Sequence, residues 1–295
     1  MSDLFGDSLQ APSRTPENAP LADKLRPAKL AEIIGQEHLT GPEGAIGRMV
    51  AAGKLSSMIL WGPPGTGRTS IARLLADAVN MHYKPISAVF SGVADLKKAF
   101  AEAEKMARTG KQTLLFVDEI HRFNRAQQDG FLPFVESGVV TLVGATTENP
   151  SFELNAALLS RTQVMVLHRL DEVALGTLLS RAEAVMDCAL PVTEDARSAL
   201  ISSADGDGRF LLNQAETLFA IHIENPLDTQ AMAALLPTNR PAPMTPPSVI
   251  MVTCRRFNVR ASAGVVSASL IPAPLFPAAF CRPHSHSMVP GGFDV

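Results

Sequence analysis

The sequence has 295 residues, with 26 Lys and Arg against 29 Asp and Glu and a formal net charge of −3. At roughly 150 residues per domain, this length indicates about two domains and enough apolar material for a core. The charge balance excludes a polybasic nucleic-acid binder, three scattered cysteines exclude a disulfide framework and a zinc site, and no apolar run reaches membrane-spanning length. We therefore expect a cytoplasmic protein with no membrane partner, whose contact with DNA, if any, is a local patch.

The first two segments of the chain differ in pattern. Residues 1–19 are polar and Pro-rich, which predicts a flexible N-terminal arm. In residues 20–168, apolar runs of strand length alternate with helical patterns at 70–81 and 93–108. The apolar runs lie at 57–61, 113–117, 139–144 and 164–167. Such alternation predicts an α/β core whose parallel sheet is buried on both faces by helices.

Strand patterns end before the last two segments. Residues 169–236 are rich in Ala and Leu at helical spacing, which predicts a small helical lid domain after the sheet. Its helical patterns cover 172–186, 193–204, 209–221 and 228–236. Residues 237–295 hold ten of the 22 prolines and one acid, Asp294. A Pro-rich disordered tail and translation out of frame both explain this composition, and both explanations stay open.

A glycine-rich motif follows the first apolar run, and its glycines have the spacing of a P-loop, G-x-x-x-x-G-K-[ST]. Its residues are Gly62, Pro63, Pro64, Gly65, Thr66, Gly67, Arg68, Thr69 and Ser70. The glycines let backbone N–H groups converge on phosphate oxygens, and the following helix adds the positive end of its dipole. The Thr69 hydroxyl is placed to bind Mg²⁺. The alternative is a strand-to-helix turn with no ligand.

Position 68 departs from the usual P-loop because it holds Arg where Lys is expected. Lysine is a compact point charge that reaches the β- and γ-phosphates, whereas arginine is a longer planar fork. We expect Arg68 to keep the attraction for phosphate but to fit poorly around the γ-phosphate. The sequence therefore predicts nucleotide binding with impaired hydrolysis.

A second motif is an apolar strand pattern that ends in Asp118 and Glu119, about 50 residues after the P-loop. This is the form of a Walker B motif, in which the first acid holds Mg²⁺ and the second activates the attacking water. Open α/β sheets bind ligands at the carboxyl ends of their strands, so both acids are expected beside the P-loop. Without the P-loop, the same pattern would merely mark a strand leaving the core.

Three strings, at 61–67, 118–124 and 144–155, resemble AAA+ ATPases. Within this class they resemble the family of replication-associated recombination protein A, which is related to the eukaryotic Werner-helicase-interacting ATPase. The resemblance covers about residues 20–236. It implies ATP and Mg²⁺ as cofactors, action on forked, single-stranded or gapped DNA, a homo-oligomer, a replisome protein as partner, and association with the nucleoid.

The resemblance also implies further site residues. The segment that packs on the adenine is matched by Leu25, Arg26, Pro27, Ile33 and Ile34. Thr147 is similar to the sensor 1 residue, Arg161 to the arginine finger that acts on a neighbouring subunit, and Arg209 to the sensor 2 residue on the lid. Without the resemblance, the adenine segment is equally compatible with a loop that runs into a short helix. Thr147 would then be a turn residue, Arg161 a surface charge or a C-cap, and Arg209 a solvated charge at a helix start.

The tail at 237–295 does not resemble the helical segments that continue this family. Because those segments make the oligomer, assembly of this chain is in doubt. Two alternatives to a fork-maintenance ATPase remain open. One is a clamp-loader subunit or a branch-migration motor, and the other is a nucleotide-binding but catalytically inert product.

Overall fold

The computed structural model describes residues 19–221 and 225–236. The predictions for the N-terminal arm and for the tail at 237–295 lie outside these residues. No helix in the described part has the length and hydropathy needed to cross a membrane.

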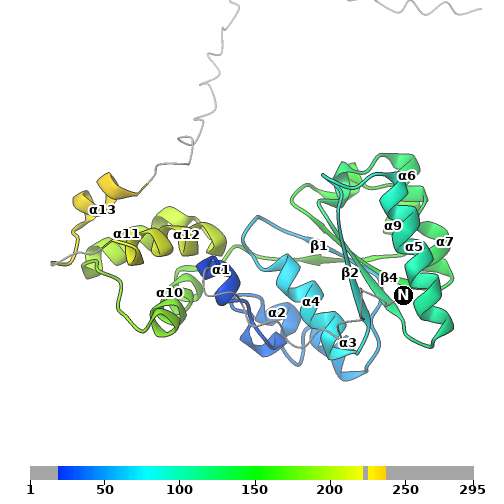
Figure 1. The fold of residues 1–295 in the computed structure, drawn as a ribbon, viewed down its shortest axis with the longest axis horizontal. Helices are drawn as coiled ribbons and strands as arrows, with labels where there is room; N and C mark the ends of the chain where they lie inside the picture. Colours follow the sequence, from blue (N-terminus) through cyan, green and yellow to red (C-terminus); the bar gives the residue numbers. More distant parts are fainter. Residues whose placement is uncertain (1–18, 222–224, 237–295) are drawn as a thin grey trace, which may run out of the picture. The chain divides into compact units, whose positions relative to one another are not determined.

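A five-stranded parallel sheet forms the centre of the fold (Figure 1). The strands are β1 (Met58–Trp61), β2 (His82–Ser87), β3 (Thr113–Asp118), β4 (Val140–Thr146) and β5 (Gln163–Val166). Their order in the sheet is β2-β3-β4-β1-β5, and every pairing is parallel. The expected α/β fold is therefore confirmed, and four of the strands coincide with the apolar runs.

The sequence pattern gave no sign of β2, which lies at one edge of the sheet. The strand contains His82, Lys84 and Pro85, so it lacks a continuous apolar run. An edge strand pairs on one side only, which tolerates both proline and polar side chains. The edge position of β2 explains why neither the spacing of its apolar residues nor its composition predicted a strand.

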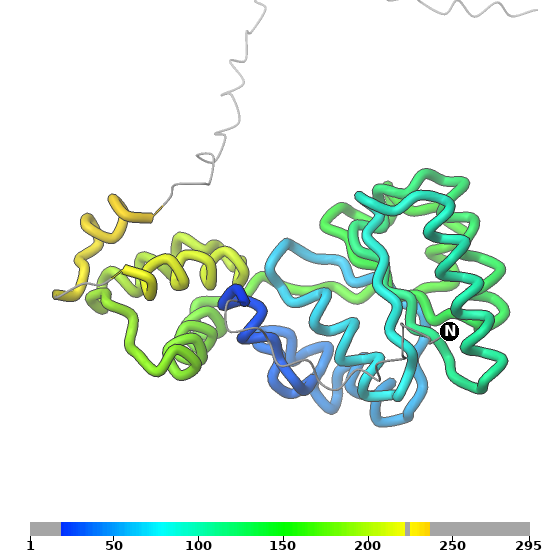
Figure 2. The backbone as a smooth tube through the Cα atoms, viewed as in Figure 1, coloured from blue at the N-terminus to red at the C-terminus, as the bar shows by residue number. Residues whose placement is uncertain are grey.

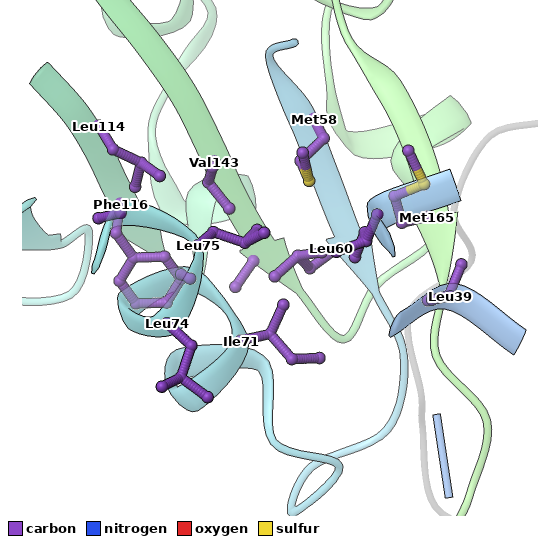
Figure 3. Close-up of a cluster of buried hydrophobic side chains, with 14 of the residues drawn as sticks. Leu39, Met58, Leu60, Ile71, Leu74, Leu75, Leu114, Phe116, Val143 and Met165 are labelled. Atoms are coloured by element: carbon purple, nitrogen blue, oxygen red, sulfur yellow. The ribbon is translucent and has the colours of Figure 1, made fainter. Parts of the chain in front are cut away.

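Helices cover both faces of the sheet, each over a separate apolar cluster. On one face, Ile71 and Leu75 of α4 (Arg68–Ala78) pack against strand residues such as Leu60 (Figure 3). On the other face, Leu96 and Phe100 of α5 (Val93–Arg108) pack in the second cluster. Burial of apolar side chains on both faces fixes the sheet, as expected for parallel strands.

Short helices connect these layers. Those before the sheet are α1 (Leu21–Lys24), the 3₁₀ turn η1 (Leu30–Glu32), α2 (Glu37–Thr40) and α3 (Ala45–Ala51). Those between strands are η2 (Ile120–Arg122), α6 (Arg125–Asp129), α7 (Leu132–Glu136), α8 (Pro150–Glu153) and α9 (Ala156–Leu159). Most are single turns, which period analysis does not detect because one turn shows no repeat.

After the sheet, the residues described up to 236 form four helices: α10 (Glu172–Met186), α11 (Glu194–Ala204), α12 (Gly208–Phe219) and α13 (Thr229–Leu235). Each begins at a side-chain cap, supplied by Asp171, Thr193, Asp207 and Asp228. Their apolar faces form a third cluster that includes Leu21 of α1. Helix α1 lies beside α12, where the Leu21 N–H donates to Glu216 at 3.0 Å (Figure 2). The domain boundary at 168 stays a prediction.

Candidate functional site

The register of the sheet brings the two predicted motifs to the same edge. Trp61 of β1 lies opposite Thr146 of β4, and Val117 of β3 lies opposite Gly144 of β4. The loop at 62–67 therefore leaves the sheet at the carboxyl edge where Asp118 also ends its strand. Parallel α/β sheets bind their ligands at this edge.

Glycine is required at two positions of the loop. Gly65 and Gly67 have φ of +73° and +91°, where side chains other than glycine are disfavoured. A Cβ on Gly65 would also lie 1.9 Å from Oδ1 of Asp207, the cap of α12. Thr66 donates from its hydroxyl to the carbonyl of Pro63 at 2.9 Å, which holds the turn. Helix α4 begins at Arg68, two residues earlier than expected.

A cavity of about 310 Å³ opens at this edge of the sheet. The predicted site residues that line it are Leu25, Arg26, Pro27, Ile33, Ile34, Pro64, Gly65, Thr66, Gly67, Arg68, Thr69, Ser70, Asp118, Glu119, Thr147 and Arg209. Gly62 and Pro63 are not among the lining residues. Segments separated by more than 180 residues thus meet around one space, with the phosphate loop, both acids and the start of α12 on its walls.

Arg181 also lines the cavity, although sequence analysis did not select it. Its Nη1 donates to the carbonyl of Glu32 at 2.6 Å and so joins α10 to the segment predicted to pack on the adenine. An arginine within an amphipathic helix belongs to no motif, so the sequence carried no signal for this contact.

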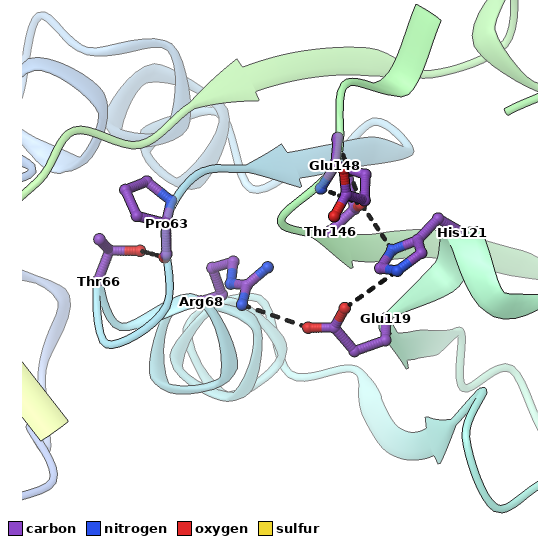
Figure 4. A network of polar contacts seen from close by, with 7 residues as sticks. All are labelled: Pro63, Thr66, Arg68, Glu119, His121, Thr146 and Glu148. Carbon is purple, nitrogen blue, oxygen red and sulfur yellow. Dashed lines mark hydrogen bonds and ion pairs between the residues drawn. The ribbon is translucent and has the colours of Figure 1, made fainter. Parts of the chain in front are cut away.

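Arg68 extends toward Glu119 across the base of the cavity (Figure 4). Its Nη2 lies 3.5 Å from Oε1 of Glu119, and the Arg68 side chain is only 10% exposed. The other guanidinium nitrogen, Nη1, is buried and has no hydrogen-bond partner within the described part of the chain. A buried unpaired donor costs about 1–3 kcal/mol. An anion in the cavity would satisfy it, so the residues present fit a phosphate group.

Glu119 itself has a left-handed backbone, with φ of +53°. This conformation is rare for a residue with a side chain and clusters at functional sites. It turns the chain into η2, which places His121 Nε2 3.4 Å from Oε2 of Glu119. His121 Nδ1 lies 2.9 Å from the hydroxyl of Thr146 at the end of β4. Thr146 was not selected from the sequence. His121 was considered only for the DNA path or for a solvated basic turn, and not as a partner of Glu119.

The structure separates Thr147, the predicted sensor 1 residue, from the neighbouring Thr146. Thr147 lines the cavity just beyond β4. Thr146 is fully buried and contacts His121, and its hydroxyl accepts from the Glu148 N–H at 3.1 Å. The sensor role of Thr147 stays a prediction.

The two predicted arginines lie in different places, Arg161 just before β5 and Arg209 in α12. Arg209 lines the cavity from the first turn of α12. Arg161 is not among the lining residues, and its Nε lies 2.5 Å from Oε1 of Glu136. Arg161 Nη1 also donates to the carbonyl of Ala157 at 2.8 Å. Its predicted role as a finger for a neighbouring subunit is not tested by a single chain and stays a prediction.

Comparison with known proteins agrees with this geometry. The family model "ATPase family associated with various cellular activities (AAA)" matches residues 58–170. The fold resembles the Thermotoga maritima RuvB Holliday junction branch migration motor, with a TM-score of 0.57, 24% identity and coverage of 71% of each chain. At that identity, the likeness concerns the fold alone.

Closer relatives exist among curated proteins. Replication-associated recombination protein A of Coxiella burnetii is 47% identical over 210 residues, which cover 70% of this chain and 47% of that protein. The protein of the same name from Escherichia coli K12 is 45% identical over 206 residues, covering 68% and 46%. ATPase WRNIP1 of Dictyostelium discoideum is 45% identical over 199 residues, covering 66% and 23%. The chain thus spans less than half the length of these relatives. It belongs to the AAA+ ATPases and, within them, to the group of replication-associated recombination protein A and WRNIP1.

Proposed function

We propose that the chain binds ATP with Mg²⁺ in the cavity at the carboxyl edge of the sheet and hydrolyses it. The observation that carries this proposal is the convergence of the phosphate loop with Asp118 and Glu119 around one cavity. There the buried Nη1 of Arg68 has no hydrogen-bond partner among the described residues. The loop backbone, a cation at Arg68 and two carboxylates form the set of groups that phosphoryl transfer requires.

Each group has a distinct role in this proposal. The loop N–H groups and Arg68 hold the phosphates, and the apolar segment at Ile33 and Ile34 packs on the base. Thr69 and Asp118 would hold Mg²⁺, and the bound ion would supply charge neutralisation at the phosphate oxygens. Glu119 accepts a proton from the attacking water. Arg209 stabilises charge from the side of α12.

Hydrolysis is proposed to be slow in this chain. Arg68 contacts the carboxylate that must serve as base, so one of its oxygens is engaged by the guanidinium and is less available to the attacking water. The same contact favours a second candidate function, in which the chain binds nucleotide without turning it over.

The wider role proposed for the chain is action on DNA in recombination and at replication forks. The names of the relatives support this role, and the chain covers less than half of each. The exposed position of Arg161 supports assembly with further copies, since an arginine finger acts on a neighbour's nucleotide. Fork-structured or gapped DNA is the expected partner, and a replisome protein is a further one.

Titration of the full chain with a fluorescent ATP analogue and Mg²⁺ tests nucleotide binding, and phosphate release with and without forked DNA tests hydrolysis. We expect saturable binding that Asp118→Asn weakens at least about tenfold in the presence of Mg²⁺. Asp77→Asn, a change at an exposed position far along α4, serves as the matched control. Equal affinity of the parent and Asp118→Asn chains, or no binding at all, would contradict the proposed function.

A further inference from the structure

The carboxylate of Glu119 is contacted on both of its oxygens by residues from different elements (Figure 4). Arg68 of α4 lies 3.5 Å from Oε1, and His121 of η2 lies 3.4 Å from Oε2. Glu119 keeps 26% of its side chain exposed toward the cavity, whereas His121 keeps 9%. The imidazole of His121 is therefore buried, and the carboxylate that it contacts remains partly exposed to the cavity.

Behind the imidazole, the Thr146 hydroxyl has three polar neighbours. It lies 2.9 Å from His121 Nδ1, accepts from the Glu148 N–H at 3.1 Å, and lies 3.3 Å from the Glu148 carbonyl. A hydroxyl has only one hydrogen to donate. The hydroxyl therefore donates either to the Glu148 carbonyl or to the imidazole. This choice decides whether Nδ1 of His121 accepts a hydrogen bond or donates one.

The hydrogens available for these contacts restrict which tautomer or protonation state His121 can adopt. When the Thr146 hydroxyl donates to Nδ1, the neutral imidazole carries its hydrogen on Nε2 and donates toward Glu119. When that hydroxyl serves the Glu148 carbonyl, Nδ1 must donate, and only the imidazolium can still donate from Nε2. The remaining neutral tautomer would place a lone pair against the carboxylate. Both favourable states thus present an N–H to Glu119.

We propose that His121 is a positioning residue for the base Glu119, and that it links this carboxylate to the end of β4 through Thr146. This inference rests on the proposed function, because Glu119 acts as a base only if the chain hydrolyses ATP. His121 contacts Oε2 and so fixes the rotamer of the carboxylate, which lines the cavity and contacts Arg68 through Oε1. A base displaced by about 1 Å loses up to about a hundredfold in rate.

The kinetic test uses three substitutions in the full chain, each made with Arg68 and with Arg68→Lys. His121→Phe keeps the ring volume without a donor, and we expect it to lower kcat about 10-fold to 100-fold while KM for ATP changes less than about twofold. His121→Gln restores an N–H at similar reach, and we expect it to retain most of the parent kcat. His82→Gln is the matched control, because His82 also contacts a carboxylate, that of Glu102 at 3.1 Å, outside the cavity.

Three kinetic outcomes decide the proposal. A loss of kcat in His121→Phe that His121→Gln restores would support it. Parent rates in His121→Phe would overturn it, and so would equal loss of nucleotide binding in both variants, since that result indicates a structural role only. Failure of the parent chain to bind or hydrolyse ATP would overturn the proposed function instead, and the inference is then decided by a second readout.

That readout is the tautomer of His121, measured by NMR on the full chain with ¹⁵N-labelled histidine and assigned with His121→Gln. We expect Nε2 to carry the hydrogen in the neutral form and Nδ1 to show the shift of an acceptor. A neutral imidazole with its hydrogen on Nδ1 would overturn the proposal, because it could not donate to Glu119. Neither result depends on hydrolysis.

Discussion

Two regions of the molecule contain the same set of groups, a glutamate contacted by one histidine and one cation. At the edge of the sheet, Glu102 of α5 contacts His82 at 3.1 Å and Lys84 at 2.5 Å. In the cavity, Glu119 contacts His121 at 3.4 Å and Arg68 at 3.5 Å. The contacts of Glu102 are short, whereas the contact between Glu119 and its cation is longer, at 3.5 Å against 2.5 Å.

The difference shows how similar residues serve either the fold or a site. His82 and Lys84 are two residues apart on β2, so both side chains lie on one side of the strand and meet Glu102 together. The hydrogen bond from Lys84 is the main cause that holds the pKa of Glu102 below its usual range. Glu119 instead receives its partners from two different elements and faces a cavity, which leaves room for a further ligand.

The largest expected effect is a difference in the rate of phosphate release between substitutions of the two glutamates. Glu119→Gln removes the proposed base, and we expect phosphate release to fall about 10²-fold to 10⁴-fold while nucleotide binding is kept. Glu102→Gln should leave the rate of phosphate release unchanged, because its partners lie outside the cavity. Steady-state assays on both variants check this. Equal rates for Glu119→Gln and the parent chain would show that the carboxylate has no part in the reaction.

A smaller effect is expected when the cation beside Glu119 is shortened. Arg68→Lys frees the carboxylate and places a compact charge near the phosphates, so we expect hydrolysis to rise about tenfold, or about 1.4 kcal/mol in the barrier. Arg73→Lys, at an exposed position of the same helix, is the matched control. If the parent and Arg68→Lys chains both hydrolyse ATP rapidly and at the same rate, Arg68 does not limit the reaction.

The smallest effect concerns stability at the edge of the sheet. Because the pKa of Glu102 is lowered in the folded chain, its contacts stabilise the fold at neutral pH, and this stabilisation is lost as the pH falls through that lowered pKa. The carboxylate is partly exposed, so we expect Glu102→Gln to cost no more than about 1 kcal/mol at pH 7. Thermal melts at pH 7 and in acid check this. A difference from the parent chain that persists after protonation of Glu102 would contradict the assignment.

Sequence patterns predicted the parts of the fold that bury apolar side chains regularly. The strands β1, β3 and β4 were found because their apolar runs are continuous where both faces are covered. Strand β5 is a largely exposed edge strand, and it was found because its own apolar run is not interrupted. Strand β2 was missed because Lys84 and Pro85 interrupt it at an edge, where one-sided pairing tolerates them.

The candidate site was predictable wherever its residues follow one another along the chain. The loop from Gly62 to Ser70 and the pair Asp118 and Glu119 carry their spacing in the sequence. The contacts of His121 with Glu119 and Thr146 depend on the register of β3 with β4 and on the left-handed backbone at 119. The spacing of residues along the chain predicts neither the strand register nor this backbone conformation. The contacts of His121 could therefore be found only in the folded structure.

A crystal structure of the Glu119→Gln chain with ATP and Mg²⁺ tests the central claim most directly. We predict a triphosphate against the N–H groups of the 64–69 loop, an oxygen within hydrogen-bond reach of Arg68 Nη1, and the metal between Thr69 and Asp118. Nucleotide bound elsewhere, or a well-ordered cavity that stays empty at saturating ATP, would contradict the claim that this edge of the sheet is the site of nucleotide binding.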